Sequence, residues 1–149
     1  MKALLPATCL LLIACNALPR DPAGTSERIA QRHVIRVGVA IGAKDFGRAA
    51  SARLLDRLAR DTGARPQLRT GATEPLFTDL RQGRLDMVLA PLSPKSPWAT
   101  MVAFSPPLAT RGTGEDQLDQ YAVLRNGENR WIMTVEKAAR AVVDPGAGQ

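Results

Sequence analysis

The sequence predicts an α/β domain, and three observations lead to this prediction. Short apolar, β-branched runs recur along the chain, and stretches with the spacing of amphipathic helices lie between them. Strands that alternate with helices form mainly parallel sheets with right-handed crossovers. The chain has 149 residues, which is the length of one domain with tails. We therefore expect a mainly parallel sheet of about four to five strands flanked by helices.

The first half of the domain is expected to run strand, helix, strand. The residues HVIRVGVA (33–40) are mostly apolar and β-branched, which is typical of a buried strand. The segment RAASARLLDRLARDTG (48–63) places apolar side chains four residues apart and predicts an amphipathic helix that Gly63 stops. A short and weakly marked strand, RPQLRT (65–70), is expected next.

The second half repeats this alternation. Thr73 is expected to cap a helix that runs to Gly83. The continuous apolar run LDMVLA (85–90) predicts a strand buried on both faces. A fourth strand is expected at QYAVLR (120–125), and the apolar spacing of NRWIMTVEKAARAVV (129–143) predicts the last helix.

The N-terminal residues predict an export signal. The single basic residue Lys2 precedes an apolar run (3–14) that is too short to cross a bilayer but has the proportions of a signal-peptide core. The residues LIAC (12–15) resemble a bacterial lipobox, so we expect residues 1–14 to be a lipoprotein signal peptide and Cys15 to carry the lipid. An uncleaved hydrophobic N-terminus is the alternative.

The remaining boundaries follow from composition. Prolines, a glycine and dispersed charges predict that residues 15–32 are a tether, with a helical turn near 26–31. The folded lobe is expected at 33–143, followed by a disordered tail at 144–149.

The charge balance favours anionic partners without indicating nucleic acid. The net charge is +6 and the pI is near 10.1. No run of three basic residues occurs and aromatic residues make up only 4%, so we expect no nucleic-acid binding. An anionic membrane surface or an anionic solute fits the scattered arginines better.

No catalytic or metal-binding constellation is visible. His33 is the only histidine, and a lone histidine at a strand entrance is more often a capping or surface residue than a base. With Cys15 acylated and Cys9 removed, no thiol is left for a disulfide or for the usual zinc sites. Asp86 on the third strand is expected to make a structural hydrogen bond. We expect no cofactor, no metal and no enzymatic activity.

The order of the segments VIRVGVA, LARDTGA, LFTDLRQGRLDMVLAPL and VAFSPPL resembles the bacterial extracellular solute-binding proteins of family 3, the substrate-binding components of ABC transporters. The matching positions on the third strand and at the crossing to the second lobe are Leu80, Gly83, Leu85, Asp86, Val102, Phe104, Ser105 and Pro107. The resemblance implies a periplasmic-binding-protein-like lobe. Only residues 108–120 stand where the family inserts its second lobe, so that lobe is missing. Lys95 and Trp98 occupy the positions of the family's threonine and its carboxylate-binding arginine.

Ligands of open α/β sheets bind beyond the carboxyl ends of the strands. The candidate ligand-binding residues are therefore Lys44, Asp45, Thr70, Gly71, Ser93, Lys95 and Trp98. For Trp98, covering the end of the sheet is favoured over stacking on a ligand.

The resemblance implies a lipid-anchored protein of the cell envelope, on the periplasmic or extracellular face. It would capture a small polar or anionic solute, amino-acid-like or an organic anion, and deliver it to an ABC permease. The alternative is an envelope interaction module that transports nothing, or a reduced remnant without a ligand.

Overall fold

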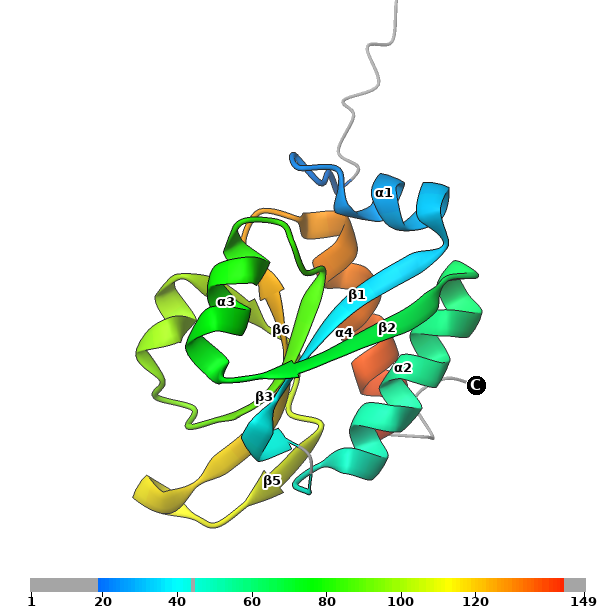
Figure 1. Cartoon of the computed structure of the whole chain (residues 1–149). Coiled ribbons are helices and arrows are strands. Elements are labelled where there is room, and N and C mark those ends of the chain that lie inside the picture. Colours follow the sequence, from blue (N-terminus) through cyan, green and yellow to red (C-terminus); the bar gives the residue numbers. More distant parts are fainter. Residues whose placement is uncertain (1–18, 44, 144–149) are drawn as a thin grey trace, which may run out of the picture.

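Strand β1 (Val34–Ala40) lies inside a mixed sheet whose strand order is β2-β1-β3-β6-β4, with β5 also paired to β6. The computed structural model describes residues 19–43 and 45–143, and these form a six-stranded sheet with helices on both faces (Figure 1). The other strands are β2 (Arg65–Gly71), β3 (Met87–Leu92), β4 (Val102–Phe104), β5 (Ala109–Arg111) and β6 (Leu118–Arg125).

The first half of the sheet is parallel, as expected from the alternation of strands and helices. β1 pairs in parallel with β2 along its full length, from Val34 opposite Arg65 to Ala40 opposite Gly71. It also pairs in parallel with β3, where Val37 lies opposite Met87. The carboxyl ends of these three strands therefore lie at one edge of the sheet, at the bottom of Figure 1.

The second half is antiparallel, which differs from the mainly parallel sheet that we expected. β6 runs antiparallel to β3 on one side and to β4 and β5 on the other. For β5 and β6 the reason is their short connection: a link of a few residues can join antiparallel strands, whereas a parallel pair needs a long crossover. Gly112, with φ of 74°, makes the left-handed bend that starts this turn.

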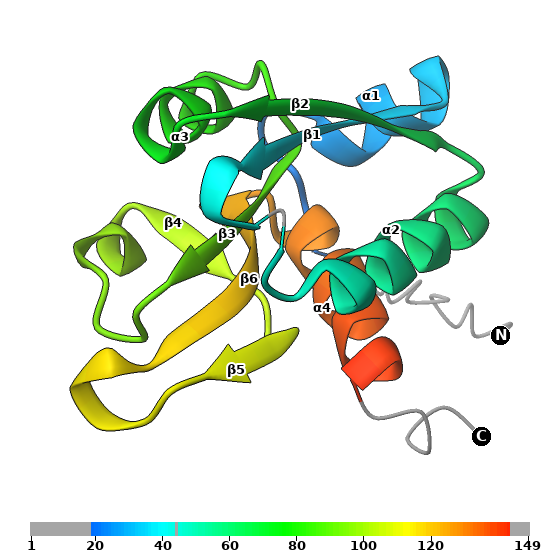
Figure 2. The ribbon, with the colours of Figure 1, turned by 60° about the horizontal axis from the view of Figure 1, so that its bottom comes forward.

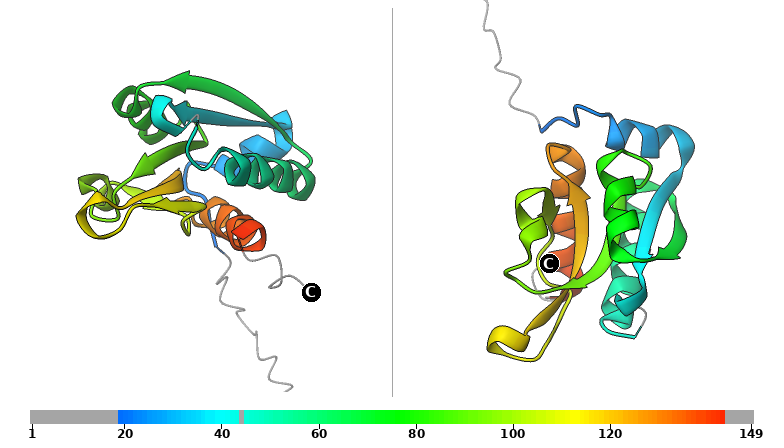
Figure 3. Two further views of the ribbon diagram at one scale, coloured as in Figure 1. Left: turned by 90° about the horizontal axis from the view of Figure 1, so that it is seen from below. Right: turned by 60° about the vertical axis from the view of Figure 1, so that its left-hand side comes forward.

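Two hydrophobic cores hold the sheet between helices (Figures 2 and 3). On one face, α2 (Arg48–Thr62) and α4 (Asn129–Val143) bury Leu54 and Trp131. On the other face, α3 (Thr73–Arg81) and the 3-10 helix η2 (Pro97–Thr100) cover the sheet, with Phe77 fully buried. The expected helices are thus confirmed in place.

Helix ends differ in detail from the sequence expectation. Gly63 does terminate α2, in a left-handed conformation with its N–H donating to the carbonyl of Ala59. Thr73, however, is the first helical residue of α3 and not its cap. The N-cap is Ala72, whose extended backbone makes the bend without a side-chain hydrogen bond.

The described part of the expected tether is folded onto the lobe. Residues Thr25–Arg32 form helix α1, and Ile29 is buried in the core beneath α2 and α4. The buried carboxylate of Glu128, just before α4, accepts hydrogen bonds from the N–H groups of Ala23 (2.8 Å) and Thr25 (3.0 Å). Because these contacts bind the segment to α4, the folded unit includes residues that we had assigned to the tether.

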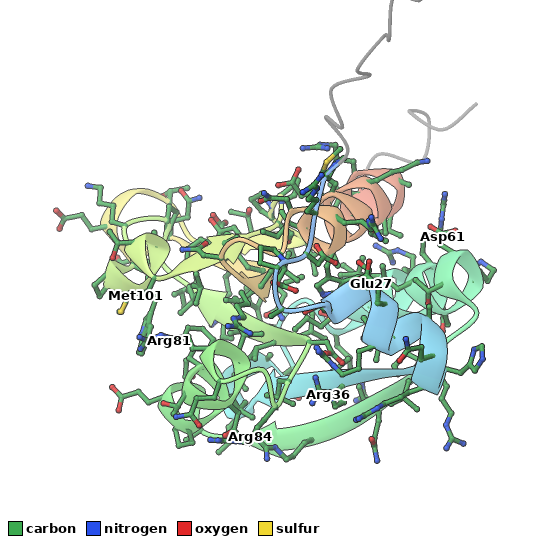
Figure 4. The ribbon with its side chains drawn as sticks, turned by 90° about the horizontal axis from the view of Figure 1, so that it is seen from above. Glu27, Arg36, Asp61, Arg81, Arg84 and Met101 are labelled. Atoms are coloured by element: carbon green, nitrogen blue, oxygen red, sulfur yellow. The ribbon has the colours of Figure 1, made fainter. Side chains whose placement is uncertain are left out.

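Asp86 ties α1 to the sheet. Its buried carboxylate accepts hydrogen bonds from the guanidinium of Arg28 on α1 (2.8 Å) and from the guanidinium and backbone N–H of Arg36 on β1. Figure 4 shows Arg36 on the side of the molecule that α1 covers. The expected structural role of Asp86 is therefore confirmed.

The expected signal peptide (1–14), Cys15 and the tail (144–149) lie outside the described residues. Among the residues that the structure describes, no helix is long and apolar enough to cross a membrane.

Candidate functional site

The carboxyl ends of β1, β2 and β3 form the edge at which a solute site is expected. After β1 the chain enters the 3-10 helix η1 (Ile41–Ala43) and then returns along α2. Figure 2 views this edge, with η1 between β2 and the hairpin formed by β5 and β6. Lys44, which we assigned to the site, lies outside the described residues.

A pocket of about 490 Å³ lies between the start of α2 and the exposed half of β1 and β2. It contains two of the predicted site residues, Asp45 and Thr70. Most of its wall is apolar, including Leu55 on α2 and Leu68 on β2. A mostly apolar wall with a few polar groups is the usual composition of a small-molecule site.

Three polar groups at and just before the start of α2 line this pocket. The exposed side chains of Asp45 and Arg48 carry opposite charges. Ser51 is 7% exposed, and its buried hydroxyl has no hydrogen-bond partner among the described residues. Gly47, the N-cap of α2, provides no capping side chain, so a ligand anion can bind the free N–H groups and the positive end of the helix dipole.

Ser93 and Lys95 lie in a different pocket. With Gly114, Glu115 and Gln117 of the β5–β6 connection they line a hollow of about 340 Å³. The Ser93 hydroxyl accepts a hydrogen bond from the backbone N–H of Lys95 at 3.3 Å, so it is used within its own turn. Four of the predicted site residues are therefore divided between two hollows, Asp45 and Thr70 in one and Ser93 and Lys95 in the other.

Gly71 and Trp98 line neither of these pockets. The face of Gly71 that would carry a side chain lies against Leu76, about 3.5 Å away. The Trp98 ring meets the edge of Phe77 at right angles, with ring centroids 4.9 Å apart, and packs against the second core. Trp98 thus takes the covering role that we gave as one of its two interpretations.

Sequence reasoning missed a buried carboxylate in the hairpin. Asp119 on β6 accepts hydrogen bonds from the hydroxyls of Thr110 (2.7 Å) and Tyr121 (2.9 Å) and from the amide of Gln117 (3.1 Å). Burial alone would raise the pKa of Asp119, but the hydrogen bonds from Thr110, Tyr121 and Gln117 outweigh it and leave the pKa below its ordinary value. Burial and the neighbouring Asp119 raise the pKa of Tyr121 to about 12. The charged carboxylate fastens the two strands of the hairpin.

Gln120, the next residue on β6, was also missed. Its side chain is fully buried under the start of α2, and both polar atoms of its amide have no partner among the described residues. Gly47 leaves room for it, because a Cβ at Gly47 would lie 2.6 Å from Gln120 Cγ. The sequence gives no signal for this contact, since it depends on the register of the hairpin.

The lone histidine has a structural position in the described part of the chain. His33 ends α1 in a left-handed conformation, with φ of 53°, and its N–H donates to the carbonyl of Ile29. This is the capping role expected for a lone histidine. The described residues contain no cluster of three histidine, cysteine or acidic side chains that could hold a metal ion.

Comparison with known proteins confirms the fold. No family model and no curated protein matches the sequence. Among solved structures, a variant of the arginine-bound form of domain 1 from TmArgBP, the ArgBP of T. maritima, is similar at 17% identity with a TM-score of 0.65, covering 78% of this chain and 97% of that one. An amino acid ABC transporter substrate-binding protein from Streptococcus pneumoniae bound to L-arginine gives 11% identity and a TM-score of 0.69, covering 82% and 93% of the two chains.

A third similar structure belongs to a longer chain. The periplasmic domain of BvgS from B. pertussis matches at 13% identity with a TM-score of 0.59, covering 89% of this chain and 46% of that one. At these identities the likeness concerns the fold. The chain therefore has the fold of one periplasmic-binding-protein-like lobe, as the order of its motifs implied.

Proposed function

We propose that this lobe captures a small zwitterionic solute of the amino-acid class in the pocket between α2 and the β1–β2 edge. The observation that carries the proposal is the composition of that pocket. Its lining combines apolar side chains with Asp45, Arg48 and Ser51, whose hydroxyl has no hydrogen-bond partner among the described residues. A solute carboxylate would bind Arg48 and the N–H groups at the start of α2. Its cationic group would bind Asp45, and its aliphatic part would pack on Leu55 and Leu68.

The similar structures support this class of solute. One of them is the arginine-bound form of domain 1 from TmArgBP. The arginine that normally grips a ligand carboxylate in the resembling family is replaced here by Trp98, which is packed on Phe77. We therefore place the carboxylate at Arg48 and the start of α2.

Calorimetric titration tests the pocket. We expect heat on addition of L-arginine or L-lysine, and a loss of affinity of about tenfold or more in Asp45→Asn, because a hydrogen bond to a charged group contributes about 1.5–3 kcal/mol. Asp56→Asn, on the exposed face of α2 and outside the pocket, is the matched control and should bind as the parent does. Lys95→Ala should also leave binding unchanged, because Lys95 lies in the other hollow.

A flat titration with amino acids, polyamines and organic anions would contradict the proposal. It would favour the alternative, in which the lobe is an envelope interaction module or a reduced binding protein without a ligand. Loss of binding in Lys95→Ala, with Asp45→Asn intact, would move the site to the hollow beside the hairpin.

We further propose that Cys15 anchors the protein to the extracytoplasmic face of a membrane, where it serves an ABC permease. The support is the lipobox-like LIAC at 12–15 and the fold shared with substrate-binding proteins. Cys15→Ser should move the protein from the membrane fraction to the soluble fraction. An unchanged membrane fraction would refute the lipid anchor while leaving the solute proposal intact.

A further inference from the structure

The outer face of α4 carries a basic groove that the proposed function does not use. Arg130, Met133, Lys137 and Arg140 are spaced by three, four and three residues, so they lie on one face of the helix, opposite the buried face that contains Trp131. The groove has a volume of about 380 Å³, and Pro19 forms its other side.

This groove combines positive charge with an exposed apolar side chain. Its lining has three basic residues, Arg130, Lys137 and Arg140, against one acidic residue, Glu136, which gives a net charge of +2. Met133, between them, is 55% exposed. Arg140 is paired with Glu136, whereas Lys137 makes no ion pair within the described residues.

Two contacts bring the start of the described chain to this groove. The backbone carbonyl of Arg20 accepts a hydrogen bond from the N–H of Asn129 at 3.0 Å, and the carbonyl of Pro19 accepts one from the Arg130 guanidinium at 3.4 Å. Arg130 also forms an ion pair with Glu27 of α1. Figure 4 shows Glu27 on the side of α1 that faces α4. Arg20 is exposed and adds a further positive charge beside the groove.

The sequence before Pro19 carries the anchor that we propose above. Residues 3–14 are apolar, and Cys15 stands four residues before Pro19. Four residues span at most about 14 Å. With a lipid on Cys15, the end of the lobe that bears Pro19 would therefore lie next to a bilayer. The carboxyl edge of the sheet lies at the opposite end of the molecule (Figure 1).

We propose that Arg20 and the outer face of α4 (Arg130, Met133, Lys137 and Arg140) form a membrane-binding surface for an anionic phospholipid bilayer. The long arginine and lysine side chains reach the phosphates, while Met133 enters the headgroup region. Each basic residue near an anionic surface strengthens binding about fivefold. The proposal does not depend on solute binding.

Fluorescence at a defined position tests the contact directly. The full chain carrying Cys9→Ser and Cys15→Ser receives one new thiol, by Met133→Cys, labelled with a polarity-sensitive dye. Arg60→Cys on the exposed face of α2 is the matched control. We expect a blue shift at position 133 with vesicles of phosphatidylcholine and phosphatidylglycerol, a much smaller one with phosphatidylcholine alone, and none at position 60. Equal shifts at both positions, or no preference for the anionic vesicles, would overturn the proposal.

Charge reversal separates this surface from the overall charge of the protein. In the chain with Cys9→Ser and Cys15→Ser, Arg20→Glu with Lys137→Glu should lower partitioning onto anionic vesicles by at least about tenfold. Arg53→Glu with Arg60→Glu on α2 makes the same change in net charge and should lower it much less. An equal loss in both pairs would show that only net charge matters and would refute the surface. A concentration-dependent shift of the dye at position 133 without vesicles would assign the groove to a second copy of the chain instead.

Discussion

Replacing Asp86 tests whether its buried carboxylate stabilises the fold, because the two arginines that pair with this carboxylate are only partly buried. The side chain is 1% exposed, and the guanidiniums of Arg28 and Arg36 that pair with it are 22% and 24% exposed. Asp86→Ala removes the acceptor of both guanidiniums and of the Arg36 N–H at 2.7 Å. Breaking a buried ion pair on one side costs about 3–5 kcal/mol, and the partial exposure of the arginines places this one near 3 kcal/mol.

Urea unfolding followed by circular dichroism measures this cost. Asp86→Asn keeps the shape and one acceptor for the Arg36 N–H, so we expect a loss of about 1.5–2 kcal/mol in the free energy of unfolding. The control is Asp61→Ala on α2, which breaks an ion pair of the same 2.8 Å length with Arg57, but with both side chains 34% exposed. An exposed pair of this kind contributes about 0.3–0.5 kcal/mol. Similar losses in Asp86→Ala and Asp61→Ala would refute the structural role of Asp86.

Three further predictions follow from other buried contacts. Glu128→Gln should weaken the hold on α1, which hydrogen exchange would detect as faster exchange of α1 amides alone; unchanged exchange would contradict it. Gly47→Ala should destabilise the fold by about 2–4 kcal/mol in the same urea assay, because the left-handed backbone disfavours alanine and the new Cβ meets Gln120. Folding raises the pKa of Tyr121 from 10.0 to about 12. Its contribution to the free energy of unfolding is therefore present below pH 10 and is lost between pH 10 and 12, by on the order of 2–3 kcal/mol. Tyr121→Phe should abolish this alkaline loss of stability, and an identical pH profile in the variant would refute the prediction.

The elements that the sequence could predict are those whose pattern is local. The β-branched run of β1 and the four-residue spacing on α2 each identify their element without knowledge of the rest of the chain. Helix α4 was predicted at the bounds that the structure has, from Asn129 to Val143. The strand β6 was expected too short: Leu118 and Asp119 belong to it because they pair with β5, and Asp119 also with β3, which the local sequence does not show.

The missed parts depend on contacts between distant segments. The docking of α1 relies on the carboxylate of Glu128. This carboxylate accepts hydrogen bonds from the N–H groups of Ala23 and Thr25, which lie more than a hundred residues earlier in the chain. No local pattern in residues 15–32 shows that a carboxylate at the other end of the chain will cap them. For the same reason the sequence could not show that Asp45 and Thr70 line one pocket while Ser93 and Lys95 line another.

The hairpin of β5 and β6 stands where the resembling family would insert its second lobe. Here the two strands pair with each other, and Asp119 fastens them through Thr110, Tyr121 and Gln117. The depressed pKa of Asp119 keeps its carboxylate charged, and therefore keeps these hydrogen bonds strong, at all pH values above its ordinary titration range. Because the edge is closed in this way, the pocket beside Asp45 is lined by residues of this lobe, and the proposed solute would bind at the start of α2.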